Sequence, residues 1–186
     1  VIIVNFNGEQ YIPDCFESLS NSEYKNIEVI FVDNGSTDNS LNVAKKLYPD
    51  GIYIQNRTNV GFAHGNNIAV KKARGEYVLL LNNDTIVTEN FLRPLVDVLQ
   101  KHKDVAVVQP LLLYRDNPHY LDGSVNSAGT YFTPTGFLYY PLYGKCIPTR
   151  ELKQKEIFAA NGACMMIRAS VIDQTGLFDD TFFSYY

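Results

Sequence analysis

The sequence lacks the features that mark membrane-spanning, disulfide-rich and nucleic-acid-binding proteins. Its longest apolar runs, such as residues 77–81, are far shorter than the roughly 20 residues that a helix needs to cross a bilayer. The three cysteines are too few and too scattered for a disulfide framework or a zinc site, which favours a reducing compartment. The net charge of −4 argues against a nucleic-acid partner, because phosphate binding usually needs a basic face.

The first part of the chain alternates between strand-like and helix-like patterns. With 186 residues, 46% of them hydrophobic, the chain is long enough for one domain with a sizeable core. Short apolar runs predict strands at residues 1–4, 27–32, 52–54, 77–81 and 105–108, and helical periodicity lies between them. Such alternation predicts an α/β fold, with a mostly parallel central sheet and helices on both faces.

The pattern changes after Pro110. Residues 111–157 are rich in Tyr, Pro and Gly and have little periodicity, which predicts irregular β structure and functional or mobile loops. Residues 158–167 have the composition of a further strand, and residues 168–176 predict a short helix that Gly176 ends.

Two of the predicted strands lead into carboxylates. Asp33 follows the strand at 27–32, and Asp84 follows the strand at 77–81 after Asn82 and Asn83. Open α/β sheets bind ligands at the carboxyl ends of their strands, so these aspartates indicate a nucleotide-and-metal site. Two plainer interpretations remain open: Asp33 caps the next helix, or Asp84 is an ordinary turn residue.

Absent motifs narrow the kind of nucleotide chemistry. The first strand is not followed by the G-x-G-x-x-G turn of dinucleotide-binding proteins, and the sequence has no G-x-x-x-x-G-K-[ST] phosphate loop. The Gly-rich turn with Arg and Lys that marks sugar-phosphate nucleotidyltransferases is also missing.

What remains resembles the family 2 inverting glycosyltransferases, which have the GT-A fold of nucleotide-diphospho-sugar transferases. Four segments carry the resemblance, in the family's order: residues 3–7 (IVNFN), 32–38 (VDNGSTD), 59–67 (NVGFAHGNN) and 80–84 (LLNND). The third looks most like bacterial rhamnosyltransferases of surface polysaccharide assembly. The resemblance covers nearly the whole chain.

The resemblance implies a donor site for a UDP- or dTDP-sugar. Asp33 would accept a hydrogen bond from the imide N–H of uracil or thymine, which cytosine lacks, and Phe6 would pack on the base. The turn at Gly61 would let the backbone approach the donor closely. The implied donor-binding residues are Asn5, Phe6, Asp33, Asn34, Asn59, Gly61, Phe62 and Asn82.

The resemblance also implies a divalent cation, Mg²⁺ or Mn²⁺, held by Asp84. Such cations prefer oxygen ligands and neutralise charge on a diphosphate leaving group. The sequence departs from the family's D-x-D pattern, because Asn82 stands in place of the first acid. A single carboxylate is expected to hold the metal more weakly than two.

On the acceptor side, the resemblance implies that Gly162 and Cys164 lie near the acceptor. The family's catalytic base follows a segment that here spans residues 178–186 (FDDTFFSYY), so the base is expected just beyond Tyr186. Asp179 and Asp180 precede that position and are not assigned as the base. We therefore expect a piece of a longer protein, with a donor-binding half at 1–110 and a truncated acceptor-side half at 111–186.

The prediction is an inverting glycosyltransferase that acts on a polysaccharide or lipid-linked acceptor, with rhamnose as one candidate sugar. We expect it in the cytoplasm, at the inner face of the membrane through peripheral association, and this piece to bind donor but transfer sugar poorly. The alternative is a non-catalytic module that binds nucleotide-sugars or glycans. His64 is expected to pack or to hydrogen-bond near a helix end, and the Tyr-rich stretch 139–143 forms either an acceptor-facing surface or a packed flap.

Overall fold

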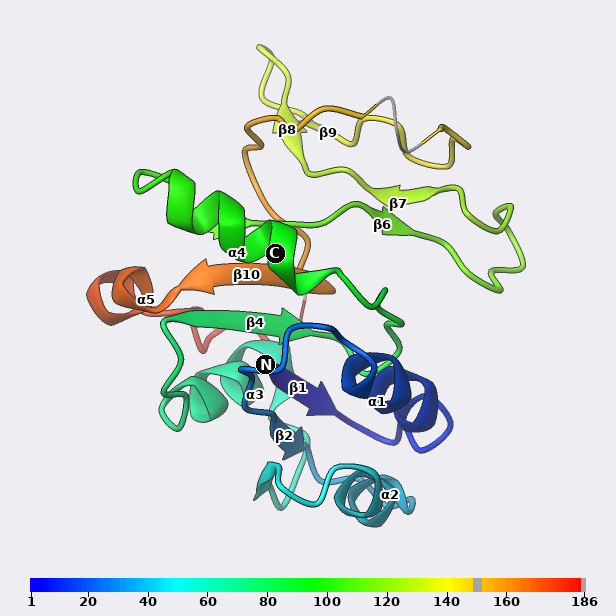
Figure 1. Ribbon diagram of the computed structural model, residues 1–186, viewed down its shortest axis with the longest axis vertical. Helices are drawn as coiled ribbons and strands as arrows, with labels where there is room; N and C mark the ends of the chain where they lie inside the picture. Colours follow the sequence, from blue (N-terminus) through cyan, green and yellow to red (C-terminus); the bar gives the residue numbers. More distant parts are fainter. Residues whose placement is uncertain (149–151, 185–186) are drawn as a thin grey trace.

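The computed structural model describes residues 1–148 and 152–184, which form a central sheet with helices on both sides and a smaller β region beyond one edge (Figure 1). The sheet has six strands in the order β3-β2-β1-β4-β10-β5. Their bounds are β1 (Ile2–Asn5), β2 (Ile30–Asp33), β3 (Ile52–Gln55), β4 (Tyr77–Leu81), β5 (Val107–Val108) and β10 (Cys164–Arg168).

The strand directions confirm the predicted α/β architecture with a mostly parallel sheet. Strand β1 pairs in parallel with β2 and β4, and β2 pairs in parallel with β3. The predicted strand at 158–167 is shorter, and it enters the sheet antiparallel to both β4 and β5. Residues 164–167 of β10 are all buried, as expected for a strand covered on both faces.

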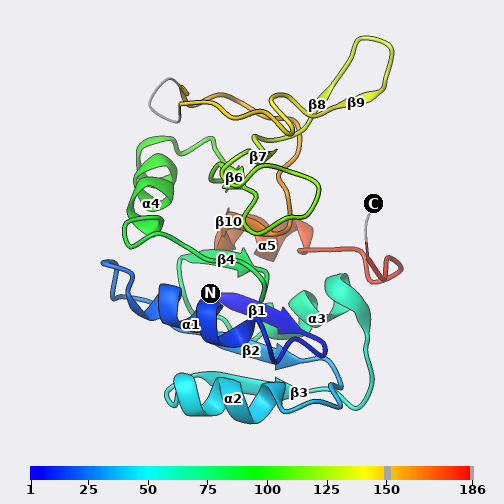
Figure 2. The ribbon, with the colours of Figure 1, turned by 90° about the vertical axis from the view of Figure 1, so that its right-hand side faces the viewer.

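Helices cover the two faces in two groups (Figure 2). One core cluster joins α1, α2 and α4 to the sheet, and a second joins α3 and α5 to the opposite face. The helices are α1 (Ile12–Ser20), α2 (Ser40–Leu47), α3 (Gly61–Val70), α4 (Leu92–Lys101) and α5 (Ala169–Thr175). No helix within the described residues is long and apolar enough to cross a membrane.

The start of α2 differs from the expected cap. Helix α2 begins at Ser40, well after Asp33. Asp38 still stabilises this turn, because its Oδ1 accepts a hydrogen bond from the Ser40 backbone N–H at 3.1 Å. Asp33 is the last residue of β2 and lies well before α2, so it does not act as the cap of this helix.

The Tyr-rich region forms two small two-stranded sheets beyond the β5 edge of the main sheet (Figure 1). The strand pairs are β6 (Leu112–Leu113) with β7 (Val125–Ser127), and β8 (Tyr131–Phe132) with β9 (Leu138–Tyr139). The rings of Tyr114 and Tyr120 stack with centroids 4.4 Å apart. This agrees with the expectation of irregular β structure and loops.

Phe31 tests the packing under α1 and α2. Its side chain is fully buried, with ring centroids of Phe16 and Tyr53 at 5.8 and 6.0 Å. We expect Phe31→Ala to lower the free energy of unfolding by about 3–5 kcal/mol and the thermal midpoint by roughly 10 °C. Phe137→Ala is the control, since this ring is 71% exposed and its loss should cost no more than about 0.5 kcal/mol. Equal effects in thermal denaturation would contradict this packing.

Candidate functional site

Asn5 joins three segments at the carboxyl edge of the sheet. It ends β1, lies opposite Asp33 of β2, and is 1% exposed. Its Nδ2 donates to Ser36 Oγ at 3.2 Å, and its Oδ1 accepts from Asn83 Nδ2 at 2.6 Å. Its backbone carbonyl accepts from the Asn34 N–H at 2.8 Å. The turn after β2 and the loop after β4 are therefore fixed to the same side chain.

Asp33 is buried at this edge with an unused acceptor. The residue is 1% exposed, and within the described part of the chain its Oδ1 has no hydrogen-bond partner. Buried polar atoms are nearly always hydrogen-bonded, and leaving one unpaired is costly. An unpaired carboxylate oxygen in this position is suited to accept a hydrogen bond from a ligand.

A network of amide side chains fixes the loop that leads into α3. Asn34 Nδ2 donates to Asn59 Oδ1 at 3.1 Å and to the Gly61 carbonyl at 3.0 Å, and Asn34 Oδ1 accepts from Asn56 Nδ2 at 2.8 Å. Asn59 Oδ1 also accepts from the Gly61 N–H at 2.9 Å. The predicted donor residues Asn34, Asn59 and Gly61 thus belong to one connected turn. Asn56 was outside the resembling segments and carried no sequence signal of its own.

The backbone of Phe183, near the C-terminal end of the chain, packs closely against Gly61. Gly61 has φ +85°, and a Cβ at this position would collide with the carbonyl oxygen of Phe183. The Phe62 N–H donates to that same carbonyl at 2.7 Å. The first turn of α3 was predicted to approach the donor, and here its Phe62 amide is bonded to Phe183.

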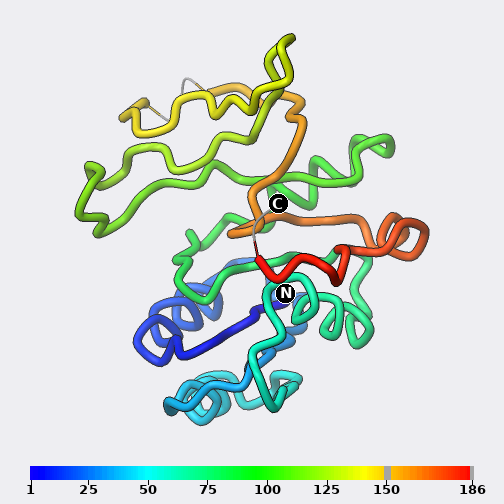
Figure 3. Tube along the Cα trace, turned by 180° about the vertical axis from the view of Figure 1, so that it is seen from behind, coloured from blue at the N-terminus to red at the C-terminus, as the bar shows by residue number. Residues whose placement is uncertain are grey.

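The segment Phe178–Phe183 lies along α3 (Figure 3). Asn67 Nδ2 donates to the Phe178 carbonyl at 2.8 Å and to Asp180 Oδ1 at 2.7 Å, and Asn67 Oδ1 accepts from the Phe178 N–H at 3.1 Å. His64 Nδ1 lies 3.0 Å from Asp180 Oδ1. His64 therefore makes a hydrogen-bonding contact, as the sequence indicated.

Asp179 and Asp180 both have partners within the protein. Asp179 Oδ1 accepts from the N–H and the hydroxyl of Thr181 at 2.9 and 2.8 Å, and these bonds hold the pKa of Asp179 below its ordinary value. The pKa of Asp180 is also lowered, by hydrogen bonds first from Asn67 and then from His64. The assignment of the base beyond Tyr186 stays a prediction.

The loop after β4 presents an exposed carboxylate at the expected metal position. Asn82 donates its N–H to the Ala163 carbonyl at 2.9 Å, and Asp84 is exposed. Within the described residues, no three His, Cys, Asp or Glu side chains gather as a metal cluster. The donor set fits a Mg²⁺ or Mn²⁺ ion only if phosphate and water supply the other ligands, which is common for these ions.

The remaining predicted residues lie at different depths. Phe6 is 47% exposed beside the sheet edge. Gly162 lies against the Phe62 ring, since a Cβ there would be 3.1 Å from it. Cys164 Sγ is in the core, and burial raises the pKa of its thiol to about 12. The acceptor-side roles of Gly162 and Cys164 stay predictions.

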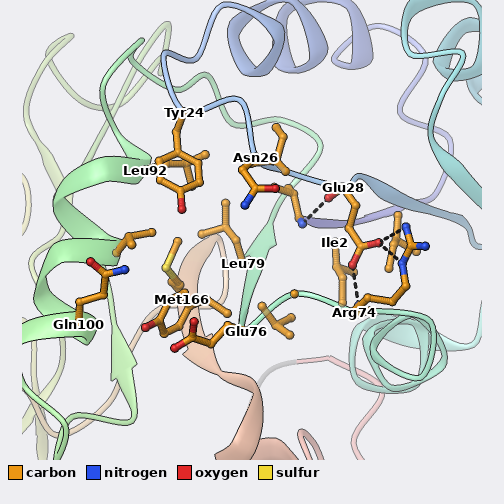
Figure 4. Close-up of a pocket in the computed structure, with 18 residues that line it drawn as sticks. Ile2, Tyr24, Asn26, Glu28, Arg74, Glu76, Leu79, Leu92, Gln100 and Met166 are labelled. Atoms are coloured by element: carbon orange, nitrogen blue, oxygen red, sulfur yellow. Dashed lines mark hydrogen bonds and ion pairs between the residues drawn. The ribbon is translucent and has the colours of Figure 1, made fainter.

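A separate cavity of about 500 Å³ opens at the amino ends of β1 and β4, away from the strand-end residues (Figure 4). Its wall carries an ion pair of Arg74 with Glu28 at 2.9 Å and the Val1 amine, which donates to the Glu28 carbonyl at 2.7 Å. None of the predicted site residues lines it.

Comparison with known proteins places the chain in one family. The model of the family described as Glycosyl transferase family 2 matches residues 1–176, and the chain belongs to this family. The low-salt glycan biosynthesis hexosyltransferase Agl10 of Haloferax volcanii is 29% identical over 190 residues, covering 100% of this chain and 57% of that protein. The glycosyltransferase GlyG of Streptococcus pneumoniae is 34% identical over 111 residues, covering 58% of this chain and 36% of that protein.

Solved structures show the same fold. S. aureus TarS 1-349 in complex with UDP superposes with a TM-score of 0.70 at 20% identity, covering 98% of this chain and 50% of that one. The mannosyltransferase PcManGT of Pyrobaculum calidifontis, in complex with GDP-Man and Mn²⁺, has a TM-score of 0.67 at 19% identity, covering 96% and 46%. The predicted GT-A fold is confirmed, and the chain spans about half the length of each of these two proteins.

The contact of Asp180 with α3 should depend on pH. Its pKa is below the ordinary value of 3.8, so the contact is present in full above that pH and is lost as the pH falls through the lowered value. We expect hydrogen-exchange protection of the Phe178 and Phe62 amides to fall only as the pH drops below the ordinary value of 3.8. His64 and Lys71 also act on this carboxylate, so Asp180→Asn is the matched control. Identical pH dependence in the variant would contradict the assignment.

Proposed function

We propose that the protein of which this chain is part transfers a sugar from a UDP- or dTDP-sugar to a saccharide or lipid-linked acceptor, with inversion at the anomeric carbon. The observation that carries the proposal is the buried, unpaired Oδ1 of Asp33 at the carboxyl edge of the sheet. Membership in the glycosyl transferase family 2, and similarity to the glycosyltransferases Agl10 and GlyG, support the same chemistry.

The base-recognition part of the proposal rests on hydrogen-bond chemistry. Uracil and thymine carry a ring N–H that can donate to the Asp33 carboxylate, and cytosine has none. Phe6 directly follows Asn5, which pairs with Asp33 across the two strands. Its exposed ring offers an apolar face on which the base can pack. TarS is described in complex with UDP and PcManGT with GDP-Man, so GDP is a necessary competitor in any test.

Asp84 is the residue that we propose as the protein ligand of a divalent cation. A bound Mg²⁺ or Mn²⁺ supplies charge neutralisation for the diphosphate leaving group. The loop places Asp84 in solvent, and Asn82 and Asn83 add amide oxygens but no further charge. We therefore expect a cation that binds weakly without donor and more tightly with it.

Inversion requires a carboxylate that takes the proton of the acceptor hydroxyl as it attacks the anomeric carbon. Asp179 and Asp180 are bonded to Thr181, Asn67 and His64, so we keep the proposal of a base that follows Tyr186. Agl10 is described as a hexosyltransferase of glycan biosynthesis, which supports a glycan acceptor. The choice of rhamnose rests on the resemblance alone, as does the inner face of the membrane as the place of action.

A second candidate is a nucleotide-sugar-binding module without transfer activity. The observation that favours it is the single exposed carboxylate at the expected metal position. Formation of a glycosylated product, or slow release of free sugar from the donor, by the complete protein would exclude this candidate.

Titration calorimetry with UDP, dTDP, GDP and CDP tests base recognition. We expect UDP or dTDP to bind and Asp33→Asn to weaken that binding by about tenfold or more, since a hydrogen bond to a charged group contributes about 1.5–3 kcal/mol. Asp104→Asn is the control, because Asp104 is exposed and lies before β5. Equal affinity in wild type and Asp33→Asn would remove Asp33 from the site, and preferred binding of GDP would overturn the choice of base.

The metal is tested by repeating the UDP titration with and without Mn²⁺. We expect Mn²⁺ to increase the affinity of the wild type, and Asp84→Ala to abolish that increase while leaving the metal-free affinity unchanged within about twofold. Asp104→Ala should behave as the wild type. A full Mn²⁺ effect in Asp84→Ala would assign the cation to other residues.

A further inference from the structure

Helix α3 contacts two regions that the sequence separates widely. On one side, the Gly61 carbonyl and N–H bind Asn34 and Asn59, both in the loops at the carboxyl edge of the sheet. On the other side, Phe62, His64 and Asn67 bind the segment Phe178–Phe183. The same first turns of one helix therefore touch both the candidate donor side and the C-terminal segment.

The contacts on the segment side are mainly polar and specific. Asn67 uses its amide as a peptide group would, donating to the Phe178 carbonyl and accepting from the Phe178 N–H. His64 and Asn67 lie three positions apart and so share one face of α3, and both bind the Asp180 carboxylate. Asp179, Asp180 and Phe183 are exposed, so little apolar burial is available to hold this segment.

The segment also makes apolar contacts through Phe178, which packs against the core cluster on the α3 side of the sheet. The Phe62 and Phe178 ring centroids lie 5.5 Å apart, and Gly162 leaves room for the Phe62 ring. Through Phe62, the segment also meets the loop that leads into β10. Phe62 thus lies between the donor-side turn, the C-terminal segment and residue 162.

We infer that α3 couples the donor-side turn to the segment Phe178–Phe183, and that His64 and Asn67 are positioning residues for the acceptor-side chemistry. The inference rests on the proposed function, since it concerns the part of the chain that leads to the expected base. The two side chains do not touch the reacting atoms. They hold the segment Phe178–Phe183 against α3. At the start of the same helix, Gly61 is bonded to the donor-side loops and Phe62 to Phe183.

Hydrogen exchange in the 186-residue chain tests the coupling without any ligand. The Phe62 amide is the reporter, because its acceptor is the Phe183 carbonyl and not the substituted residue. We expect Asn67→Ala and Asp180→Ala each to reduce its protection by about tenfold, in line with the loss of two or more hydrogen bonds. Asn42→Ala is the matched control, since Asn42 is exposed on α2 and its side chain binds only locally, to Asn39. The amide of Phe31 reports global stability, and in Asn42→Ala it should keep the protection that it has in the wild type.

Two measurements distinguish a positioning role of Asn67 from a role in donor binding. The UDP affinity of Asn67→Ala should stay within about twofold of wild type, whereas kcat of the complete protein should fall about tenfold or more without a matching rise in the donor KM. Asp180→Asn keeps an oxygen acceptor for Asn67 and should recover part of both the Phe62 protection and kcat.

Unchanged Phe62 protection in both alanine variants would overturn the coupling. Lost protection together with a loss of UDP affinity as large as that of Asp33→Asn would place the segment in the donor site and overturn the positioning role. If neither UDP nor dTDP binds to the wild type or the variants, the proposed function fails and the positioning role of His64 and Asn67 fails with it, while the exchange result still decides the coupling.

Discussion

The buried side chain of Asn5 holds the carboxyl edge of the sheet together. Parallel pairing of β1 with β2 and β4 brings three strand ends to one edge, and Asn5 then bonds to Ser36 after β2 and to Asn83 after β4. Both the donor and the acceptor of this buried amide are hydrogen-bonded, so the positions of the two loops are well defined. Removing Asn5 would release both loops and, with them, the environment of Asp33.

A contrast between neighbouring residues gives this edge its chemistry. Asn5 and Asn34 are buried and have partners for their side-chain amides, whereas Asp33 is equally buried and keeps one oxygen unpaired. Structural polar groups in a folded protein are normally satisfied internally, and groups left unsatisfied are often those that a ligand completes. The amide network thus provides a rigid frame, and the carboxylate remains available for recognition.

Local sequence patterns were sufficient for the sheet edge but not for the strand order. Short apolar runs that end at Asn5, Asp33 and Asn82 predicted the parallel strands and their common carboxyl edge. The insertion of β10 between β4 and β5 depends on pairing between residues distant in sequence, such as Met166 with both Leu79 and Val108, which periodicity does not encode. The contact of Asn67 with Asp180 was missed for the same reason: each residue lay in a resembling segment, but nothing local paired them.

The central claim is that Asp33 recognises the base of a nucleoside diphosphate at this edge. A crystal structure of the chain with UDP and Mn²⁺ tests it most directly. The account predicts the uracil imide N–H within hydrogen-bonding distance of Asp33 Oδ1, the base against Phe6, and the diphosphate toward Asp84. Density for UDP in the cavity beside Arg74 and Glu28, or a base that leaves Asp33 Oδ1 unpaired, would contradict it.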